Sequence, residues 1–308
     1  MLTTARQIVA VVIVNFRSSE LIARNYRLFG PPGYLVVIVD NYSDEDERAR
    51  IRGLCDDRGF IFVPLDHNLG FGHGANAGAE TALALGASVL VFLNPDAEPS
   101  PQLVEDLAIE VVHDPKTIVC PKVVDLRGVT RFSGAYLYPR SGRVRNWTSP
   151  RKPSQDGAPT TWLTGACLGV GEAAWRKLGG FRTEYFMYWE DVDFSFRAEM
   201  AGFKLRVRSD LVLRHDQGGT QQGPEASRSE LYYRYNIRNR LLFAATNLPR
   251  AQLRLWLMST PAVAWEVVTD GGRRQLLEHP TLIRGALRGL AEGVAVASLR
   301  LMKATMIR

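Results

Sequence analysis

The sequence predicts an α/β protein with a doubly wound, mainly parallel sheet. Two observations carry this prediction: continuous apolar runs recur through the first 125 residues, and helical stretches with short connections separate them. Continuous apolar runs are typical of strands buried on both faces. Repeated strand–helix units with short connections indicate parallel strands covered by helices on both sides.

Each expected element follows from its local pattern. The apolar runs predict strands at 8–14, 35–39, 60–63, 88–93 and 118–124. Helices are expected near 18–29, 44–57, 74–85 and 101–113, the third ending at Gly86. Turn formers and basic residues predict a loop-rich insertion or hairpin at 126–160. A second ordered block is expected at 161–215, followed by a helical remainder.

Composition is that of an ordinary globular protein. The 308 residues, 46% hydrophobic and 23% charged, suffice for one large α/β domain with an appendage, or for two domains. The three cysteines show no CxxC spacing, which favours buried free thiols and a reducing compartment. The apolar stretch at 8–14 is too short to span a bilayer and lacks a small-residue cleavage site, so we interpret it as a strand.

Two acidic stretches about ninety-five residues apart suggest the chemistry. Asp96 follows the apolar run 88–93, at a position that faces the ligand crevice of open α/β sheets. The cluster 190–193 follows an aromatic run and opens a predicted helix. One carboxylate to hold Mg²⁺ or Mn²⁺ and another to take a proton are the minimum equipment for moving a group off a diphosphate. Both stretches also have a structural alternative, as residues that begin a helix.

Other polar residues stand at predicted strand ends or turns. Asn15 and Asp40 end the first two strands, where a carboxylate could accept the imino N–H of a uracil or thymine ring, or could simply belong to the cap of the next helix. The glycine-rich segment 66–78 could approach a phosphate or serve only as a turn. His215, after an apolar strand, could be a further metal ligand or an ordinary structural histidine.

A series of motifs resembles glycosyltransferase family 2. In chain order they are VVIVN, VDNYSDED, NLGFGHGANAG, NPD, TGACLGV, GGFRTEYFMYWEDVDFSFRAEMAGFKL, RHDQGGT and YYRYNIRNR. The resemblance spans roughly residues 8–245, and within the family it is strongest to bacterial rhamnosyltransferases of cell-envelope polysaccharide synthesis. It implies the GT-A fold and inversion at the anomeric carbon.

The resemblance also implies roles for individual residues. Asp191 is the expected catalytic base, and Asp96 and His215 are the expected metal ligands. Trp189 and Glu190 are expected at the acceptor. The expected nucleotide-sugar contacts are Asn15, Asp40, Asn68, Gly70, Asp96 and Arg238. Asn94 departs from the family pattern, because it replaces the first acid of an Asp-x-Asp motif, and this predicts modest metal affinity.

The expected activity is metal-dependent transfer of a sugar, L-rhamnose from dTDP-β-L-rhamnose, to a glycan or polyprenyl-linked saccharide. The alternatives are another donor on the same fold (UDP-galactofuranose, UDP-GlcNAc or GDP-mannose), a sugar nucleotidyltransferase, and a non-catalytic binder. A nucleotidyltransferase usually opens with a glycine-rich, basic phosphate loop, which is absent after Val14. The expected division is a nucleotide-sugar half at 1–125, an acceptor and catalytic half at 126–245, and a helical extension at 246–308.

The extension is expected to be amphipathic and basic. From Arg238 onward there are eleven Lys/Arg against four Asp/Glu, although the whole chain carries only +6. Apolar residues from Leu282 to Ala297 recur at helical spacing, and no stretch reaches the length that crosses a bilayer. We therefore predict a peripheral position in the cytoplasm, on an anionic inner membrane face. Packing on the domain itself and a homodimer interface are the alternatives, and nucleic-acid binding is not expected.

Overall fold

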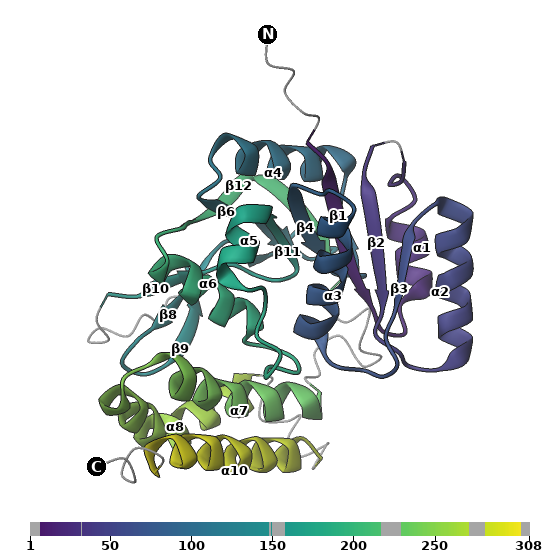
Figure 1. The fold of residues 1–308 in the computed structure, drawn as a ribbon. Coiled ribbons are helices and arrows are strands. Elements are labelled where there is room, and N and C mark those ends of the chain that lie inside the picture. Colours follow the sequence, from purple (N-terminus) through teal and green to yellow (C-terminus); the bar gives the residue numbers. More distant parts are fainter. Residues whose placement is uncertain are drawn as a thin grey trace.

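The computed structural model describes residues 7–31, 33–147, 149, 158–216, 229–270 and 281–302. Its centre is a nine-stranded sheet in which neighbouring strands follow the order β3-β2-β1-β4-β11-β6-β12-β5, with β7 paired to β6 (Figure 1). Helices cover the sheet, and a separate layer of helices lies along one end of the molecule.

The first half of the sheet is parallel and follows the expected strand–helix alternation. The strands are β1 (Val9–Asn15), β2 (Leu35–Asp40), β3 (Ile61–Pro64) and β4 (Val89–Leu93). The helices are α1 (Ser19–Asn25), α2 (Glu45–Arg58), α3 (Phe71–Ala84) and α4 (Pro101–His113). Asn15 pairs with Asp40 at the ends of β1 and β2, so both residues reach the carboxyl edge of the sheet. The expected elements are confirmed, with α1 shorter and α3 starting earlier than the sequence suggested.

The second half of the sheet contains the antiparallel strands. β11 (Cys167–Gly171) lies antiparallel between β4 and β6 (Thr117–Val124), so that β6 points the same way as β4. β12 (Lys204–His215) then pairs parallel to β6. The short strands β5 (Ala97–Glu98) and β7 (Thr130–Phe132) run antiparallel to β12 and β6. Six of the nine strands therefore share one direction, which confirms the predicted α/β, mainly parallel GT-A fold.

Part of the region expected to be a loop or hairpin forms a small second sheet. Strands β8 (Ala135–Tyr138), β9 (Arg143–Asn146) and β10 (Thr160–Trp162) pair antiparallel in the order β10-β8-β9. Helices α5 (Glu172–Leu178) and α6 (Glu190–Met200) follow β11. The three cysteines are buried and free, as predicted.

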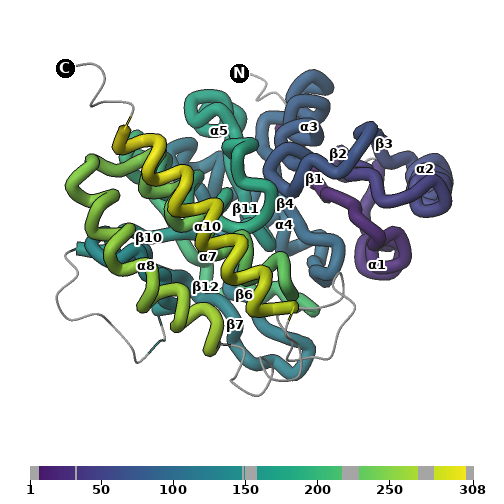
Figure 2. The backbone as a smooth tube through the Cα atoms, turned by 90° about the horizontal axis from the view of Figure 1, so that it is seen from below, coloured from purple at the N-terminus to yellow at the C-terminus, as the bar shows by residue number. Residues whose placement is uncertain are grey.

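The C-terminal helices form the separate layer. They are α7 (Glu230–Asn247), α8 (Arg250–Asp270) and α10 (Thr281–Met302). Figure 2 shows α10 lying along α7, with α8 beside both. Gly285 and Gly289 of α10 face the α7 backbone, where an added Cβ would lie 2.5 Å and 2.2 Å from the carbonyl oxygens of Glu230 and Arg234. Helices that approach this closely require glycine at the contact.

Only part of the predicted apolar stripe of α10 serves this packing. Leu282, Ala286 and Ala297 are buried, whereas Ile283 and Leu287 are exposed. None of the described helices combines the length and apolarity needed to cross a bilayer. Two basic residues of the predicted amphipathic extension, Lys303 and Arg308, lie outside the described residues.

Candidate active site

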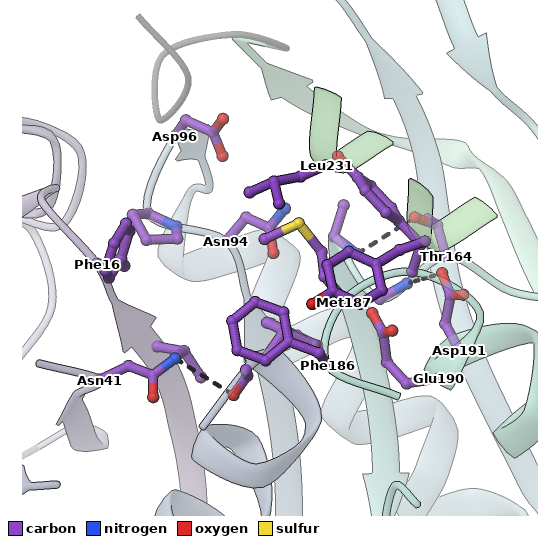
Figure 3. A pocket seen from close by; sticks show the side chains of 18 of the residues that line it. Phe16, Asn41, Asn94, Asp96, Thr164, Phe186, Met187, Glu190, Asp191 and Leu231 are labelled. Atoms are coloured by element: carbon purple, nitrogen blue, oxygen red, sulfur yellow. Dashed lines mark hydrogen bonds between the residues drawn. The ribbon is translucent and has the colours of Figure 1, made fainter. Parts of the chain in front are cut away.

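A cavity of about 610 Å³ opens at the carboxyl edge of the sheet. Its walls come from the ends of β1 and β4, the turn before β11, the segment that leads into α6, and the first turns of α7 (Figure 3). Open α/β sheets bind ligands at this edge. Among the predicted site residues, those that line the cavity are Asn68, Gly70, Asp96, Glu190, Asp191 and His215. The two acidic stretches therefore share one cavity, although they are far apart in the sequence.

Asp96 and His215 form a pair at one wall. His215 Nε2 lies 2.8 Å from Asp96 Oδ1, and the Asn94 side-chain amide lies 3.4 Å from the same imidazole nitrogen. The pair is set by the sheet, because His215 at the end of β12 is in register with Ala97 of β5, and the Asp216 amide donates to the Asp96 carbonyl. Both side chains are buried, and His215 Nδ1 has no partner among the described residues.

This donor set suits a hard divalent cation but is incomplete alone. Carboxylate and imidazole groups are ordinary ligands of Mn²⁺, and Mg²⁺ prefers oxygen. Within the described ranges, no group of three or more His, Cys, Asp or Glu side chains could hold a metal ion. Any cation at Asp96 and His215 would therefore need further oxygen ligands, which a bound diphosphate provides.

Asp191 lies on the other wall, at the first turn of α6. Its Oδ2 accepts a hydrogen bond from the Gly165 amide at 3.0 Å, and its Oδ1 accepts one from the Val192 amide at 2.8 Å. Burial raises the pKa of Asp191 to about 6, although both amides favour the ionised form. A carboxylate with such a pKa is ionised near neutral pH yet basic enough to accept a proton.

Glu190 is the neighbour of Asp191 and behaves differently. Burial and the nearby charge of Asp191 raise the pKa of Glu190 well above its usual value. Its Oε2 is buried at the cavity wall and makes no hydrogen bond to any described residue. This oxygen is therefore free to contact a ligand in the cavity.

A strained turn delivers both acids to the cavity. Tyr188 and Trp189 have positive φ angles of 64° and 75°, which is unfavourable for bulky residues. The side-chain amide of Asn239 on α7 donates to the carbonyls of Met187 and Tyr188, each at 2.8 Å. Asn239 is fully buried, so these two bonds are shielded from water and hold the turn in place.

A buried ion-pair network holds the next turn of α6. Asp193 is fully buried and receives hydrogen bonds from Arg182 at 2.8 Å, Arg197 at 2.7 Å and Asn247 of α7 at 2.7 Å. Arg197 also donates to the Gly180 carbonyl at 2.8 Å. Asp193, unlike Asp191, thus forms ion pairs with two arginines and has a structural role.

The glycine-rich segment supports this same region. An added Cβ at Gly70 would lie 2.1 Å from the Phe186 carbonyl oxygen, which instead accepts from the Phe71 amide at the start of α3. Asn76 of α3 bonds both the amide and the carbonyl of Phe181. Close contact with the backbone of Phe186, in the segment before Asp191, therefore explains the glycine at position 70. This contact fits the structural alternative for the glycine-rich segment, that of a turn.

The predicted nucleotide contacts Asn68, Asn15 and Asp40 lie at two different distances from the cavity surface. Asn68 and Asn41 line the cavity, and their side chains are hydrogen-bonded to each other at 3.1 Å. Asn15 and Asp40 are buried behind that lining. Asp40 Oδ2 binds Arg48 at 2.7 Å, while its Oδ1 lacks a partner within the described part of the chain. Asp44, rather than Asp40, caps α2.

Two predicted residues lie elsewhere. Trp189 packs against Phe243 and Trp256 under the helical layer, and Arg238 donates to the Glu184 carbonyl at 3.1 Å. Neither lines the cavity. The residue after Trp189, Glu190, lines the cavity instead. The residue after Arg238, Asn239, holds the turn before Glu190.

Apolar lining residues were not anticipated individually. They are Val14, Phe16, Phe71, Val123, Phe132, Phe186, Met187, Leu231 and Tyr235. Phe186 and Met187 belong to the aromatic run that was noted before the acids, and Phe186 stacks on Tyr235 of α7. Phe132 and Leu231 carry no local signal, because only the tertiary fold brings them to the site.

Comparison with known sequences gives a consistent result. Residues 11–165, about half of the chain, match the family described as Glycosyl transferase family 2. The low-salt glycan biosynthesis hexosyltransferase Agl10 of Haloferax volcanii is 24% identical over 296 residues, which cover 91% of this chain and 90% of the relative. The N-acetylglucosaminyl-diphospho-decaprenol L-rhamnosyltransferase of Mycobacterium tuberculosis is 28% identical over 220 residues, covering 61% and 69%.

Solved structures share the fold. The mannosyltransferase PcManGT from Pyrobaculum calidifontis, in complex with GDP-Man and Mn²⁺, aligns with a TM-score of 0.54 and 17% identity, over 97% of this chain and 88% of that one. GalNAc-T7 with UDP, GalNAc and Mn²⁺ aligns with a TM-score of 0.56 and 14% identity, over 77% and 47%.

Proposed function

The chain belongs to glycosyl transferase family 2 and is a glycosyltransferase, and from this premise we propose that it transfers L-rhamnose from dTDP-β-L-rhamnose to a lipid-linked saccharide, with inversion. The observation that carries the proposal is the shared cavity of Asp191 and the Asp96–His215 pair. In this proposal Asp191 is the proton acceptor, and the Asp96–His215 pair faces the donor diphosphate across the cavity.

In the proposed reaction, Asp191 takes the proton of the acceptor hydroxyl as its oxygen attacks the anomeric carbon. The bond from that carbon to the diphosphate breaks on the opposite face, so the configuration inverts. The Gly165 and Val192 amides hold the Asp191 carboxylate in position. Glu190 Oε2, which has no partner among the described residues, forms a hydrogen bond with a hydroxyl group of the sugar.

The leaving diphosphate needs a positive partner. Among the described residues, no lysine or arginine lines the cavity. We therefore assign Asp96 and His215 to one Mg²⁺ or Mn²⁺ ion, which would neutralise charge on the leaving diphosphate. Both similar structures, PcManGT and GalNAc-T7, are complexes with Mn²⁺, which supports this assignment.

The choice of rhamnose rests on two supports. One relative is named as an L-rhamnosyltransferase. The apolar side chains of Phe186, Met187 and Leu231 also suit the methyl group of a 6-deoxy sugar better than a hydroxymethyl group. The acceptor class, a saccharide on a polyprenyl diphosphate, follows the same relative's name, and we place the reaction in the cytoplasm at the inner membrane face.

A donor panel tests the proposal. The purified protein, a GlcNAc-diphosphopolyprenol and Mn²⁺ or Mg²⁺ are incubated with dTDP-rhamnose, UDP-galactofuranose, UDP-GlcNAc or GDP-mannose, and products are identified by mass spectrometry. We expect kcat/KM for dTDP-rhamnose to exceed the others by at least about tenfold. Preference for another donor would overturn the rhamnose assignment, and full activity in excess EDTA would overturn the metal assignment.

A further inference from the structure

Two helices of the C-terminal layer expose apolar side chains that no described part of the chain covers. On α8 the exposed residues Leu255, Met258 and Trp265 recur at spacings of three and seven. On α10, Ile283 and Leu287 are exposed at a spacing of four. Met258, Leu287 and Trp265 are 70%, 62% and 58% exposed. Helical spacing of this kind places each set along one side of its helix.

The two helices lie side by side in the C-terminal layer. They contact each other, and Figure 2 shows both backbones at the end of the molecule that is turned toward the viewer. Grouped exposed apolar side chains on a folded protein mark interaction sites. We define the surface of Leu255, Met258, Trp265, Ile283 and Leu287 as the α8–α10 face.

Cations flank the α8–α10 face. Arg254, next to Leu255, is exposed, and so are Arg284 and Arg288 beside Ile283 and Leu287. Arg284 pairs with Glu230, while Arg288 pairs with Glu292 four residues along α10. Apolar side chains bordered by arginine on a helix are typical of segments that lie in the interface of an anionic bilayer.

The start of α7 connects the cavity to the start of α10. Ser229 and Leu231 line the cavity at the start of α7, and Leu231 is 42% exposed. Glu230, between them, contacts the first turns of α10 at Gly285 and Arg284. The helix that carries Ile283 and Leu287 therefore packs directly on the helix that lines the cavity.

We propose that the α8–α10 face docks on an anionic phospholipid bilayer and thereby presents the cavity to acceptors embedded in it. The link to acceptors rests on the proposed function, whereas the docking does not. A second copy of the chain is the other occupant, but the flanking arginines favour an anionic surface.

Vesicle flotation of the full chain tests the docking. The double variant Met258→Glu/Leu287→Glu is compared with Leu85→Glu/Ile109→Glu, which makes the same charge change at two exposed apolar positions elsewhere. We expect wild type and control to float with phosphatidylglycerol-containing vesicles, the first variant to lose most of this binding, and none to float with pure phosphatidylcholine. Equal flotation of both variants, or none by wild type, would overturn the proposal, as would a dimer that only the first variant dissociates.

Activity separates this proposal from the proposed function. With a short-chain, water-soluble acceptor, the first variant should match wild type, and with the long-chain acceptor in vesicles it should fall behind. Docking without transfer of any sugar would leave the surface standing and remove the acceptor link. Equal loss with both acceptors would overturn the acceptor link, because the loss would then not depend on the membrane.

Discussion

The two walls of the cavity are built in different ways. Asp96 and His215 stand at the ends of neighbouring strands, and the hydrogen-bond register of β5 and β12 brings them together. Asp191 stands at the start of a short helix after a strained turn, held by side chains from α3 and α7. The Asp96–His215 wall, the proposed metal side, therefore depends on backbone pairing, whereas the Asp191 wall, the proposed base side, depends on a few buried side-chain hydrogen bonds.

The largest expected effect comes from Asp191 itself. Asp191→Asn keeps nearly the same shape but cannot accept a proton, so turnover should fall by about 10²–10⁴-fold with donor binding retained. Steady-state kinetics and donor titration measure both quantities. More than about a third of wild-type turnover would remove Asp191 from the base role, since general bases contribute far more than threefold.

The pH profile tests the same residue without mutation. The base must be ionised to act, and burial raises the pKa of Asp191 to about 6. Activity should therefore be full above this pKa and be lost as the pH falls through about 6. A profile of kcat/KM that stays flat down to the ordinary range of an aspartate, about pH 4, would contradict the assignment.

On the metal side, His215→Ala should weaken metal activation and leave the fold intact. The metal concentration for half-maximal activity should rise by at least about tenfold, as seen when groups around a bound metal are removed. Saturating Mn²⁺ should restore part of the activity. An unchanged metal requirement would separate His215 from the cation.

The base side should be sensitive to a residue that touches neither substrate nor metal. Asn239→Ala removes two buried hydrogen bonds to the turn before Glu190, at a cost of about 1–3 kcal/mol in stability. We expect kcat to fall with little change in donor KM. Asn236→Ala is the control, because the Asn236 side chain donates to the Tyr232 carbonyl within its own helix, α7. A loss of stability with unchanged kcat would make Asn239 purely structural.

The smallest effect should come from the helix contact farthest from the chemistry. Glycine-to-alanine changes within helices usually stabilise by about 0.5–1 kcal/mol. Gly53→Ala on α2, with open space around it, should follow this rule, whereas Gly289→Ala should destabilise because its Cβ would lie 2.2 Å from the Arg234 carbonyl. Thermal unfolding gives the sign of each change. Stabilisation by both would mean that α10 is not held this closely to α7.

Some features of the site required tertiary information. The Asn239 contacts cross 51 and 52 residues, and Asn76 reaches Phe181 across 105. Both residues belong to motifs of the resemblance, NLGFGHGANAG and YYRYNIRNR, but neither motif predicted these contacts. Trp189 illustrates the reverse case, because its place beside the acids suggested the acceptor, yet the positive φ turns its ring into the core.

The sequence by itself determined the strands and helices of the first half, since continuous apolar runs can be satisfied only by burial on both faces of a sheet. Its motifs also predicted Asp96, Asp191 and His215 as site residues, and all three line one cavity. Tertiary structure alone decided which exposed side of α10 remained free, because three glycines let α10 press one side against α7. Tertiary structure also determined that Gly70 packs against the backbone of Phe186, in the segment before Asp191. Such choices depend on how closely two backbones approach, and that distance is a property of the packed chain rather than of any local pattern.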